Sequence, residues 1–395
     1  MEGVYLVGGV RSPFGRYGGK LAAVRPDDLL AFVLEAVVKS YPQIPLAAYD
    51  EVIIGAANQA GEDNRNVARM ALLLAGLPVE VPGVTVNRLC ASGLEAILQG
   101  ARAIATGEAD LVLAGGVESM SRAPFVLGKP DTAFPRRLEL YDTTIGWRFT
   151  NPRLAEKYPP YSMGETAENV AQRYGLSRAA QDAYALRSQQ RYAQAYAKGF
   201  FAKEILPIPL PDGTLMEKDE HPRPEVTLEK LAQLKPAFRP EGTVTAGNSS
   251  GINDGAAVVL LASEKAVRAY ELTPLARIVA GATAGVDPAY MGLGPVPATH
   301  KLLRRTQLTL QDIDLIELNE AFAAQVLACQ QLLEIPEEKL NVHGGAIAIG
   351  HPLGASGARL ALTLARSLKY YNKRFGLVTL CVGVGQGVSL LLERA

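Results

Sequence analysis

Two distant parts of the chain share the same short motifs in the same order. The segment Asp50–Ile54 matches Asp314–Leu318 at an offset of 264 residues, and Ala91–Gly93 matches Ala355–Gly357 at the same offset. Self-similarity at a fixed offset indicates one supersecondary unit that is present twice. The chain has 395 residues, whereas a single hydrophobic core stops growing at roughly 250 to 300. We therefore predict two similar halves and at least two cores.

Short β-rich runs alternate with helical segments in both copies. In the first copy we expect strands at Val4–Gly8, Glu51–Ile54, Val84–Asn87 and Leu111–Ala114, and helices at Asp28–Lys39 and Ser92–Ala105. In the second copy we expect strands at Ala276–Ala280, Leu315–Glu317, Leu340–Val342 and Leu377–Leu380, and helices at Ala298–Arg305 and Ser356–Leu368. Apolar residues at helical spacing predict one buried stripe on each of the helices at 92–105 and 356–368. The alternation predicts an α/β protein whose mixed or parallel sheets are covered by helices.

The residues from about 120 to 247 interrupt the repeat. Prolines and aromatic residues crowd 122–161, a polar helical stretch runs from 166 to 198, and a proline-rich segment covers 207–240. Prolines confine such a segment to turns and extended pieces, so another sheet unit is not expected there. We predict an inserted region that carries ligand or subunit contacts.

The charge balance and the cysteine count exclude several function classes. Forty Lys plus Arg balance forty Asp plus Glu, so the net charge is zero and a dedicated nucleic-acid binder is not expected. The start of the chain, Met1–Tyr5, does not match a secretory leader, and no apolar stretch has membrane-spanning length, so we predict a cytoplasmic protein without a membrane span. The three cysteines, Cys90, Cys329 and Cys381, are far apart, which favours free thiols over a disulfide framework or a metal site.

Cys90 lies where a predicted strand gives way to a predicted helix. Free backbone N–H groups and the positive end of the helix dipole favour a thiolate at such a junction. A nucleophile placed there is expected to be activated. From placement alone, a buried cysteine that packs as a small apolar side chain is an equally open alternative.

Two of the four histidines, His343 and His351, occur in the glycine-rich stretch 343–357. An imidazole within reach of a cysteine sulfur supplies the general base that a thiol needs. His351 directly precedes the second-copy helix, which favours a functional role. His343 can instead hydrogen-bond to the loop backbone.

Three further motifs carry polar groups at strand ends or in glycine-rich turns. Cys381 begins the turn Cys381–Gly387, whose backbone N–H groups could form an oxyanion hole. Taken alone, Cys381 is better interpreted as a buried core cysteine. Asn319 closes a predicted strand and could orient a water or an oxyanion, although asparagine is more often a turn former there. Gly247–Gly251 matches the G-x-S-x-G elbow of serine hydrolases, but turn residues follow it where a helix is needed. A loop that lines a ligand tunnel is the better interpretation of that segment.

Taken together, five segments resemble the thiolase family. They are Val86–Gly93, Gly115–Ser121, Asn319–Phe322, Gly344–Gly357 and Cys381–Gly387, in the family's order and spread over almost the whole chain. The resemblance implies a thiolase-like α/β fold, with two repeated βαβαβαββ halves in a five-layered α/β/α/β/α arrangement and an inserted loop domain. It places the first half at 1–119 and 248–272, the loop domain for coenzyme A and oligomer contacts at 120–247, and the second half at 273–395. It also implies a homodimer or homotetramer.

The resemblance assigns roles to five residues. Cys90 matches the acylated nucleophile, His351 its activating base, and Cys381 the acid/base that moves the α-proton of acetyl-CoA. Asn319 matches the residue that holds a catalytic water, which forms a first oxyanion hole with His351. The backbone N–H groups of Cys90 and Gly383 match a second oxyanion hole. Thioester exchange needs a thiolate and the carbon–carbon step needs separate proton handling, and these groups provide both.

For coenzyme A, the resemblance implies a binding site in the inserted region and just after it. The matching positions are Met163, Arg223, Phe238, Ala246, Ser250, Ala321 and Phe322. Coenzyme A and acyl-CoA are expected as substrates, and no permanently bound cofactor is expected. An exposed Arg223 could alternatively be a solvated charge.

Two segments bear on the substrate. Ser162–Gly164 stands where biosynthetic thiolases typically carry His-Met-Gly, which weakens strict acetoacetyl-CoA specificity, and Tyr141–Phe149 is more similar to degradative thiolases, including those that act on 3-oxoadipyl-CoA. We therefore expect reversible cleavage of 3-oxoacyl-CoA to acetyl-CoA and a shortened acyl-CoA, as in fatty-acid β-oxidation, through an acyl-cysteine. Condensation of two acetyl-CoA is the alternative reaction. A non-catalytic acyl-CoA-binding subunit is the alternative of a different class, and the complete catalytic set argues against it.

Overall fold

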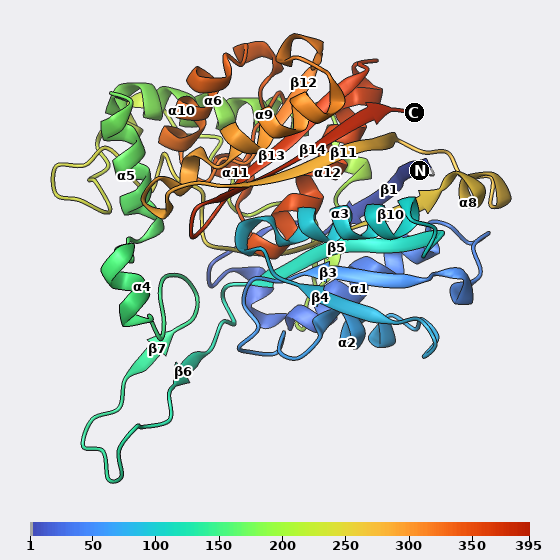
Figure 1. The fold of residues 1–395 in the computed structure, drawn as a ribbon, viewed down its shortest axis with the longest axis horizontal. Helices are drawn as coiled ribbons and strands as arrows, with labels where there is room; N and C mark the ends of the chain where they lie inside the picture. The colour runs from blue at the N-terminus through green and yellow to red at the C-terminus, as the bar shows by residue number, and fades with distance from the viewer. Residues whose placement is uncertain (1–2) are drawn as a thin grey trace.

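The chain repeats one order of strands and helices twice, with a long excursion inside the first copy (Figure 1). The computed structural model describes residues 3–395, so Met1 and Glu2 of the predicted first half lie outside the described residues. The first copy consists of β1 (Val4–Arg11), α1 (Pro26–Lys39), β3 (Glu51–Gly55), α2 (Val67–Leu74), β4 (Gly83–Val86), α3 (Ser92–Ala105), β5 (Leu111–Ser119) and β10 (Asn253–Ser263). The second copy consists of β11 (Ala276–Gly285), α9 (Pro295–Thr306), β12 (Leu315–Leu318), α10 (Ala323–Leu333), α12 (Leu353–Tyr370), β13 (Phe375–Val382) and β14 (Gln386–Arg394).

Single hydrogen bonds show that the sequence repeat is a structural repeat. The Asp50 carboxylate accepts from the N–H of Leu111 at 2.9 Å, and the Asp314 carboxylate accepts from the N–H of Phe375 at 2.9 Å. The two acceptors, Asp50 and Asp314, are 264 positions apart, and so are the two donors, Leu111 and Phe375. In both copies the carboxylate ties the beginnings of two neighbouring parallel strands together. The predicted repeat is confirmed in the part of the chain that the structure describes.

The predicted strand at Leu340–Val342 is wrong. Leu340 makes only an isolated parallel bridge to Ile316, whereas β4, at the same place in the first copy, pairs with β3 over four residues. Asn341 has a φ of 45°, which an extended strand cannot contain. The Asn341 side chain replaces the strand pairing, because it accepts from the Leu318 N–H and donates to the Leu318 carbonyl.

All main strands form one mixed sheet in the order β12-β13-β14-β11-β1-β10-β5-β3-β4. Each copy contributes its strands in the same relative order, with parallel pairs at the outer edges and antiparallel pairs towards the middle. The two copies join through β1 and β11, which pair at only two positions. The sheet therefore consists of two groups of strands that can lie in different layers.

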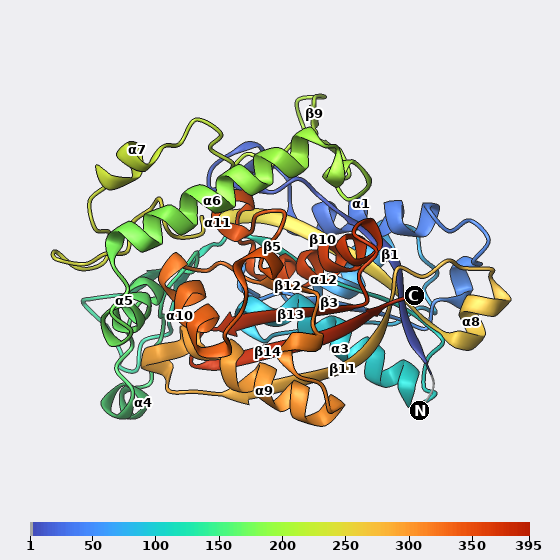
Figure 2. The same ribbon diagram turned by 90° about the horizontal axis from the view of Figure 1, so that it is seen from above.

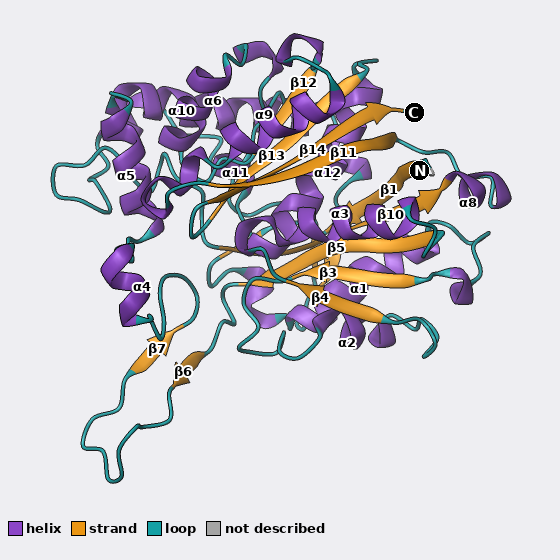
Figure 3. Cartoon of the chain, viewed as in Figure 1, coloured by secondary structure: helices purple, strands orange, loops and turns teal. Residues whose placement is uncertain are grey.

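Helices α3 and α12 lie between these two groups of strands (Figure 1). Both helices contact strands of the first and of the second copy. The helices α1 and α2 cover the outer face of the first group, and α9 covers the outer face of the second (Figure 3). This is the predicted five-layered order. The predicted single buried stripe is wrong for α12, which is buried all round over 354–365 because sheet or helix covers every side.

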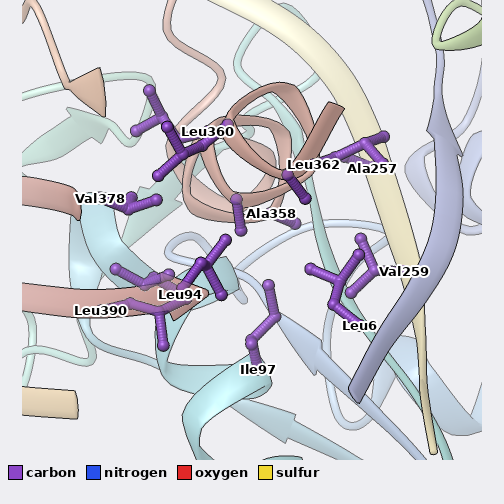
Figure 4. Close-up of a cluster of buried hydrophobic side chains, with 14 of the residues drawn as sticks. Leu6, Leu94, Ile97, Ala257, Val259, Ala358, Leu360, Leu362, Val378 and Leu390 are labelled. Atoms are coloured by element: carbon purple, nitrogen blue, oxygen red, sulfur yellow. The ribbon is translucent and has the colours of Figure 1, made fainter. Parts of the chain in front are cut away.

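The central core is packed between the two groups of strands (Figure 4). It contains side chains of α3 and α12 together with inward-facing residues of both groups of strands, among them Leu6, Leu94, Ile97, Val259, Leu360, Leu362, Val378 and Leu390. Separate clusters lie under α1 and α2 and under α9 and α10, in agreement with the prediction of more than one core. The central helices are therefore held on all sides, which fixes the residues at their N-terminal ends.

The excursion between β5 and β10 contains no further sheet unit among its described residues, as predicted. Its elements are β6 (Phe125–Leu127), β7 (Leu140–Asp142), α4 (Pro152–Lys157), α5 (Met163–Arg173), α6 (Arg178–Ala197), β8 (Ile208–Pro209), β9 (Leu215–Met216) and α7 (Leu228–Ala232). The β6–β7 hairpin projects from the body, and α6 lies across the second copy against α10 and α11 (Ala346–Ile349) (Figures 1 and 2). The remaining short elements are β2 (Gly15–Arg16) and α8 (Glu264–Ala269).

Across the described residues 3–395, no helix combines the length and the apolar character needed to cross a membrane.

Candidate active site

The repeated Ala-Ser-Gly motifs bring the beginnings of α3 and α12 into contact. A Cβ atom on Gly93 would lie 2.4 Å from the Gly354 carbonyl oxygen, and a Cβ atom on Gly357 would lie 2.3 Å from the Leu94 nitrogen. Only glycine permits so close an approach of two backbones. Cys90 precedes α3 and His351 precedes α12, so the packing of the two helices brings both residues to one place.

The backbone before Cys90 is held in an unusual conformation. Leu89 has a φ of 46°, a conformation that costs on the order of 1–3 kcal/mol for a bulky residue. The Asn87 side chain accepts from the Leu89 N–H at 2.8 Å, and the Ser92 hydroxyl donates to the Leu89 carbonyl at 2.6 Å. These bonds fix the turn Leu89–Ala91 that carries Cys90. The predicted strand-to-helix junction is thus present, with one tight turn inserted.

The sulfur of Cys90 is a thiol in this state of the protein. Burial raises the pKa of Cys90 to about 11, although the backbone N–H groups of Gly383 and of Cys90 itself donate to the sulfur and act in the opposite direction. The buried Glu118 raises the pKa of Cys90 further. In the substrate-free protein, desolvation outweighs the backbone donors, which opposes the thiolate expected from the helix end.

The hydrogen bonds of His351 define its tautomer. The Ser356 hydroxyl donates its proton to the Pro352 carbonyl at 2.8 Å, so it accepts from Nδ1 of His351, 2.6 Å away. Nε2 of His351 is left with its lone pair, 3.2 Å from Nδ2 of Asn319. Burial lowers the pKa of His351 to about 3, and the positive charge of Arg359 lowers it further. The imidazole is neutral at pH 7 and can accept a proton at Nε2.

The pKa values of Cys90 and His351 predict how fast Cys90 reacts with a small electrophile. With a pKa near 11, roughly one Cys90 side chain in ten thousand is ionised at pH 7. Alkylation of Cys90 by iodoacetamide, followed on the Cys90 peptide by mass spectrometry, is expected to accelerate with rising pH and to show no plateau below about pH 10. His351→Asn serves as the control and should likewise show no plateau below about pH 10. A plateau near neutral pH that disappears in the control would instead demonstrate a thiolate–imidazolium pair.

Asn319 follows β12 directly and is fully buried. Its Oδ1 has no hydrogen-bond partner among the described residues, whereas its Nδ2 lies against His351. A buried amide oxygen without a partner is unfavourable in a folded protein. A water at this position would satisfy it, which agrees with the predicted role of Asn319.

Cys381 is the next-to-last residue of β13, and Gly383 lies in the turn between β13 and β14. Burial raises the pKa of Cys381 well above its ordinary value, and the nearby Cys90 raises it further. Cys381 and Cys90 line the same cavity. Cys381 is therefore a neutral thiol in the cavity that contains Cys90, with a proton to donate.

A cavity of about 550 Å³ is lined by Cys90, His351 and Cys381. All seven residues that were predicted to contact coenzyme A line the same cavity, namely Met163, Arg223, Phe238, Ala246, Ser250, Ala321 and Phe322. Asn319 lies behind His351, and Gly383 lies beside Cys90. Ten of the twelve predicted site residues thus line one cavity, and the other two, Asn319 and Gly383, contact His351 and Cys90.

A second cavity, of about 380 Å³, meets the first at Cys90 and Met163. It is also lined by residues 143–148 of the excursion, of which Ile145 and Gly146 border the first cavity too, and by Asn58 and Tyr161. Cys90 therefore stands at the junction of two cavities that extend to different parts of the protein.

Other residues considered from the sequence lie elsewhere or are engaged in structural contacts. His343 lines a separate small cavity, where its ring stacks on Phe200 with centroids 3.6 Å apart. The Ser249 hydroxyl donates to the Thr245 carbonyl at 2.7 Å, so the G-x-S-x-G segment lines the 550 Å³ cavity as a loop. The Cys329 thiol donates to a backbone carbonyl in the core.

The sequence interpretation missed three functional neighbours. Ser356 fixes the His351 tautomer, and its membership of the repeated Ala-Ser-Gly motif was the available signal. The Glu118 carboxylate accepts hydrogen bonds from the backbone N–H groups of Ala57 and Gly354, and so links the loop after β3 to the beginning of α12. Burial raises the pKa of Glu118 to about 7. Arg148 lines the second cavity, and its place in the segment Tyr141–Phe149, which is similar to degradative thiolases, was the available signal.

Family models match almost the whole chain. The model described as "Thiolase, N-terminal domain" matches residues 4–265, and the model described as "Thiolase, C-terminal domain" matches residues 272–394. The chain belongs to the thiolase family. It is an acyltransferase that cleaves 3-oxoacyl-CoA with coenzyme A, reversibly, to acetyl-CoA and a shortened acyl-CoA.

Relatives of this thiolase match over their full length. It is 59% identical to the beta-ketoadipyl-CoA thiolase of Pseudomonas aeruginosa, with 99% of each chain covered. It is 56% identical to the 3-oxoadipyl-CoA/3-oxo-5,6-dehydrosuberyl-CoA thiolase of Escherichia coli, with 100% of each chain covered. The crystal structure of the acetyl-CoA acetyltransferase of Bacillus anthracis superimposes with a TM-score of 0.94 at 42% identity and covers 100% of this chain and 99% of the other. This likeness confirms the predicted thiolase fold.

The described residues, 3–395, contain no group of three or more His, Cys, Asp or Glu side chains placed to hold a metal ion.

Proposed function

We propose that this thiolase cleaves 3-oxoadipyl-CoA with coenzyme A to acetyl-CoA and succinyl-CoA. The observation that carries the chemistry is the convergence of Cys90, His351 and Cys381 on one cavity lined by all the predicted coenzyme A contacts. The substrate class is supported by relatives named for 3-oxoadipyl-CoA or beta-ketoadipyl-CoA at 55–59% identity over the full length. This replaces the expectation of fatty-acid β-oxidation with a dicarboxylic substrate.

In the first half-reaction, Cys90 attacks the 3-oxo carbon as its proton passes to Nε2 of His351. Because the resting pair is a thiol and a neutral imidazole, proton transfer accompanies the attack instead of preceding it. The N–H groups of Cys90 and Gly383, which point at the sulfur in the free protein, stabilise the oxygen of the tetrahedral intermediate. The bond between C2 and C3 then breaks, and the shortened acyl group remains on Cys90.

The leaving enolate of acetyl-CoA needs a proton at C2, and Cys381 supplies it. A water on Asn319 and the protonated His351 stabilise the enolate oxygen. The Cys381 thiolate then recovers a proton from His351, and in the second half-reaction His351 takes the proton of the incoming coenzyme A thiol. The coenzyme A sulfur attacks the acyl group, and Cys90 recovers its proton from His351. These steps need only thiol, imidazole, amide and backbone groups, and coenzyme A takes part as a substrate.

Coenzyme A is proposed to lie along the 550 Å³ cavity. The Arg223 guanidinium donates to the backbone carbonyl of His221 at 2.7 Å and lies at an exposed end of the cavity, where a phosphate can reach it. Phe238 and Phe322 meet edge to face with centroids 6.2 Å apart and provide an apolar wall for the pantetheine arm.

Steady-state rates with three substrates test the proposed function. The value of kcat/KM is expected to be highest for 3-oxoadipyl-CoA, lower for 3-oxohexanoyl-CoA and lowest for acetoacetyl-CoA. A preference for acetoacetyl-CoA, or for two acetyl-CoA in condensation, would favour the biosynthetic alternative. Binding of coenzyme A without turnover would favour a non-catalytic subunit.

Ser162 offers a second test, because it lines both cavities where biosynthetic thiolases typically carry histidine. Ser162 is also the N-cap of α5: it accepts from the Glu165 N–H, and the Glu165 carboxylate accepts from the Ser162 N–H. Ser162→His is expected to raise kcat/KM for acetoacetyl-CoA relative to longer substrates and to cost about 1 kcal/mol of stability through loss of the cap. Ser162→Ala removes the cap alone and should leave the substrate ratio unchanged. An unchanged ratio in both variants would show that position 162 does not contact the acyl group.

The domain boundaries, the oligomeric state and the compartment remain our predictions. The excursion is bounded by β5 and β10, which pair along their lengths, in keeping with an inserted domain at 120–247. The projecting hairpin exposes apolar side chains, among them Phe134 at 96% exposure, which supports its predicted subunit contacts in a homodimer or homotetramer. All three cysteines are free, as expected for a cytoplasmic protein.

A further inference from the structure

The second cavity contains a cation without a partner. Arg148 is partly buried on its wall, and in the described part of the chain no hydrogen bond, ion pair or aromatic ring engages its guanidinium. The other partly buried arginines of the described chain each make a hydrogen bond or an ion pair, as Arg88 and Arg178 do with carboxylates at 2.8 Å. The charge of Arg148 has no such partner and is available to an anionic ligand.

The segment that carries Arg148 runs between β7 and α4 (Figure 1), and side-chain hydrogen bonds hold it in place. The Asn58 amide donates to the Thr143 hydroxyl at 3.0 Å, and this hydroxyl donates to the Pro124 carbonyl at 2.6 Å. The indole N–H of Trp147 donates to the Tyr161 carbonyl at 3.0 Å. Arg148 is therefore presented by a segment whose neighbouring side chains are anchored.

One acidic residue, Glu118, also lines this cavity, but its oxygens are occupied. They accept from the backbone N–H groups of Ala57, Asn58 and Gly354 at 2.8–3.0 Å. Burial raises the pKa of Glu118 to about 7, so its negative charge is incomplete at neutral pH. Among the described residues that line the cavity, Arg148 is the group left to bind an anion.

We infer that Arg148 binds the terminal carboxylate of the acyl group and makes this thiolase selective for dicarboxylic 3-oxoacyl-CoA. The inference rests on the proposed function, because only a 3-oxoadipyl-type substrate brings a carboxylate beyond Cys90. The coenzyme A part occupies the 550 Å³ cavity, so an acyl group on Cys90 extends into the 380 Å³ cavity, whose wall contains Arg148. A guanidinium binds a carboxylate with two parallel hydrogen bonds, and its unmatched charge disfavours an apolar chain end.

The experiment compares two substrates of equal length, 3-oxoadipyl-CoA and 3-oxohexanoyl-CoA, in the full-length enzyme. Arg148→Gln is expected to lower kcat/KM for 3-oxoadipyl-CoA on the order of a hundred-fold and to leave 3-oxohexanoyl-CoA within a few-fold of the wild type. Arg148→Lys should recover part of the loss, because it restores the charge without the paired donors. Arg153→Gln is the matched control, since Arg153 is an exposed arginine of the same region that lines neither cavity.

A second measurement does not depend on turnover. Succinyl-CoA and butyryl-CoA are each incubated with the enzyme, and the acyl group on Cys90 is quantified by mass spectrometry after acid quenching. Arg148→Gln should lose succinyl labelling and keep butyryl labelling. Equal loss with both donors would assign Arg148 a structural role and overturn the inference.

The wild-type result separates the two hypotheses. If the wild type does not prefer 3-oxoadipyl-CoA, the proposed function is wrong and the inference falls with it. If the wild type does prefer it and Arg148→Gln keeps the preference, the inference alone is wrong.

Discussion

Cys90→Ala is expected to abolish both thiolysis and condensation, with a loss of kcat on the order of a million-fold, as for other enzymes that lose a covalent nucleophile. The sulfur stands at the junction of the two cavities, and the backbone N–H of Gly383 is directed at it. Ser249, the serine of the G-x-S-x-G segment in the same cavity, is not equally placed, because its hydroxyl is engaged with a backbone carbonyl.

The measurement is the acyl group itself. Wild-type enzyme incubated with acetyl-CoA and quenched in acid should carry an acetyl thioester on the Cys90 peptide, and Cys90→Ala should carry none. Cys329→Ala is the control, because this buried cysteine bonds to the Gly292 carbonyl in the core and should not affect labelling. Acetyl groups on Ser249, or continued turnover without any acylated residue, would refute the assignment.

Cys381→Ala is expected to lower thiolysis and condensation by a factor of about a hundred to ten thousand while Cys90 still accepts an acetyl group. Cys381 is the neutral thiol in the cavity that contains Cys90, and its proton is needed only for the carbon–carbon step. Acetylation of Cys90 involves proton transfer to His351 and does not need Cys381.

Two readouts separate these roles. The amount of acetyl-Cys90 formed from acetyl-CoA should remain near that of the wild type. Exchange of the α-protons of acetyl-CoA for deuterium, followed by NMR, should disappear. Cys381→Ser preserves the packing of β13 but has a much less acidic hydroxyl, so it should resemble Cys381→Ala. Near-normal thiolysis in either variant would show that Cys381 only fills space in the core.

Local sequence signals predicted most of the fold. The helix Ser92–Ala105 has the predicted bounds, because its apolar spacing and its ends are encoded within the segment itself. The strand at Leu340–Val342 was wrong because the side chain of Asn341, in a left-handed conformation, takes the hydrogen bonds that a strand backbone would make. That competition depends on where Leu318 lies in space, which a single segment does not reveal.

The sequence by itself determined the repeat and the α/β class, and it predicted the site residues, because motifs such as Val86–Gly93 and Gly344–Gly357 carry their chemistry within one short segment. Only the tertiary structure decided the electrostatics of the site and the shape of its cavities. Burial, which raises the pKa of Cys90 and lowers that of His351, results from the packing of the two groups of strands around α3 and α12. The proposed role of the unpaired Arg148 likewise depends on the second cavity, whose lining residues come from segments far apart in the chain. Desolvation and cavity shape are properties of the assembled core, and no local pattern of residues encodes them.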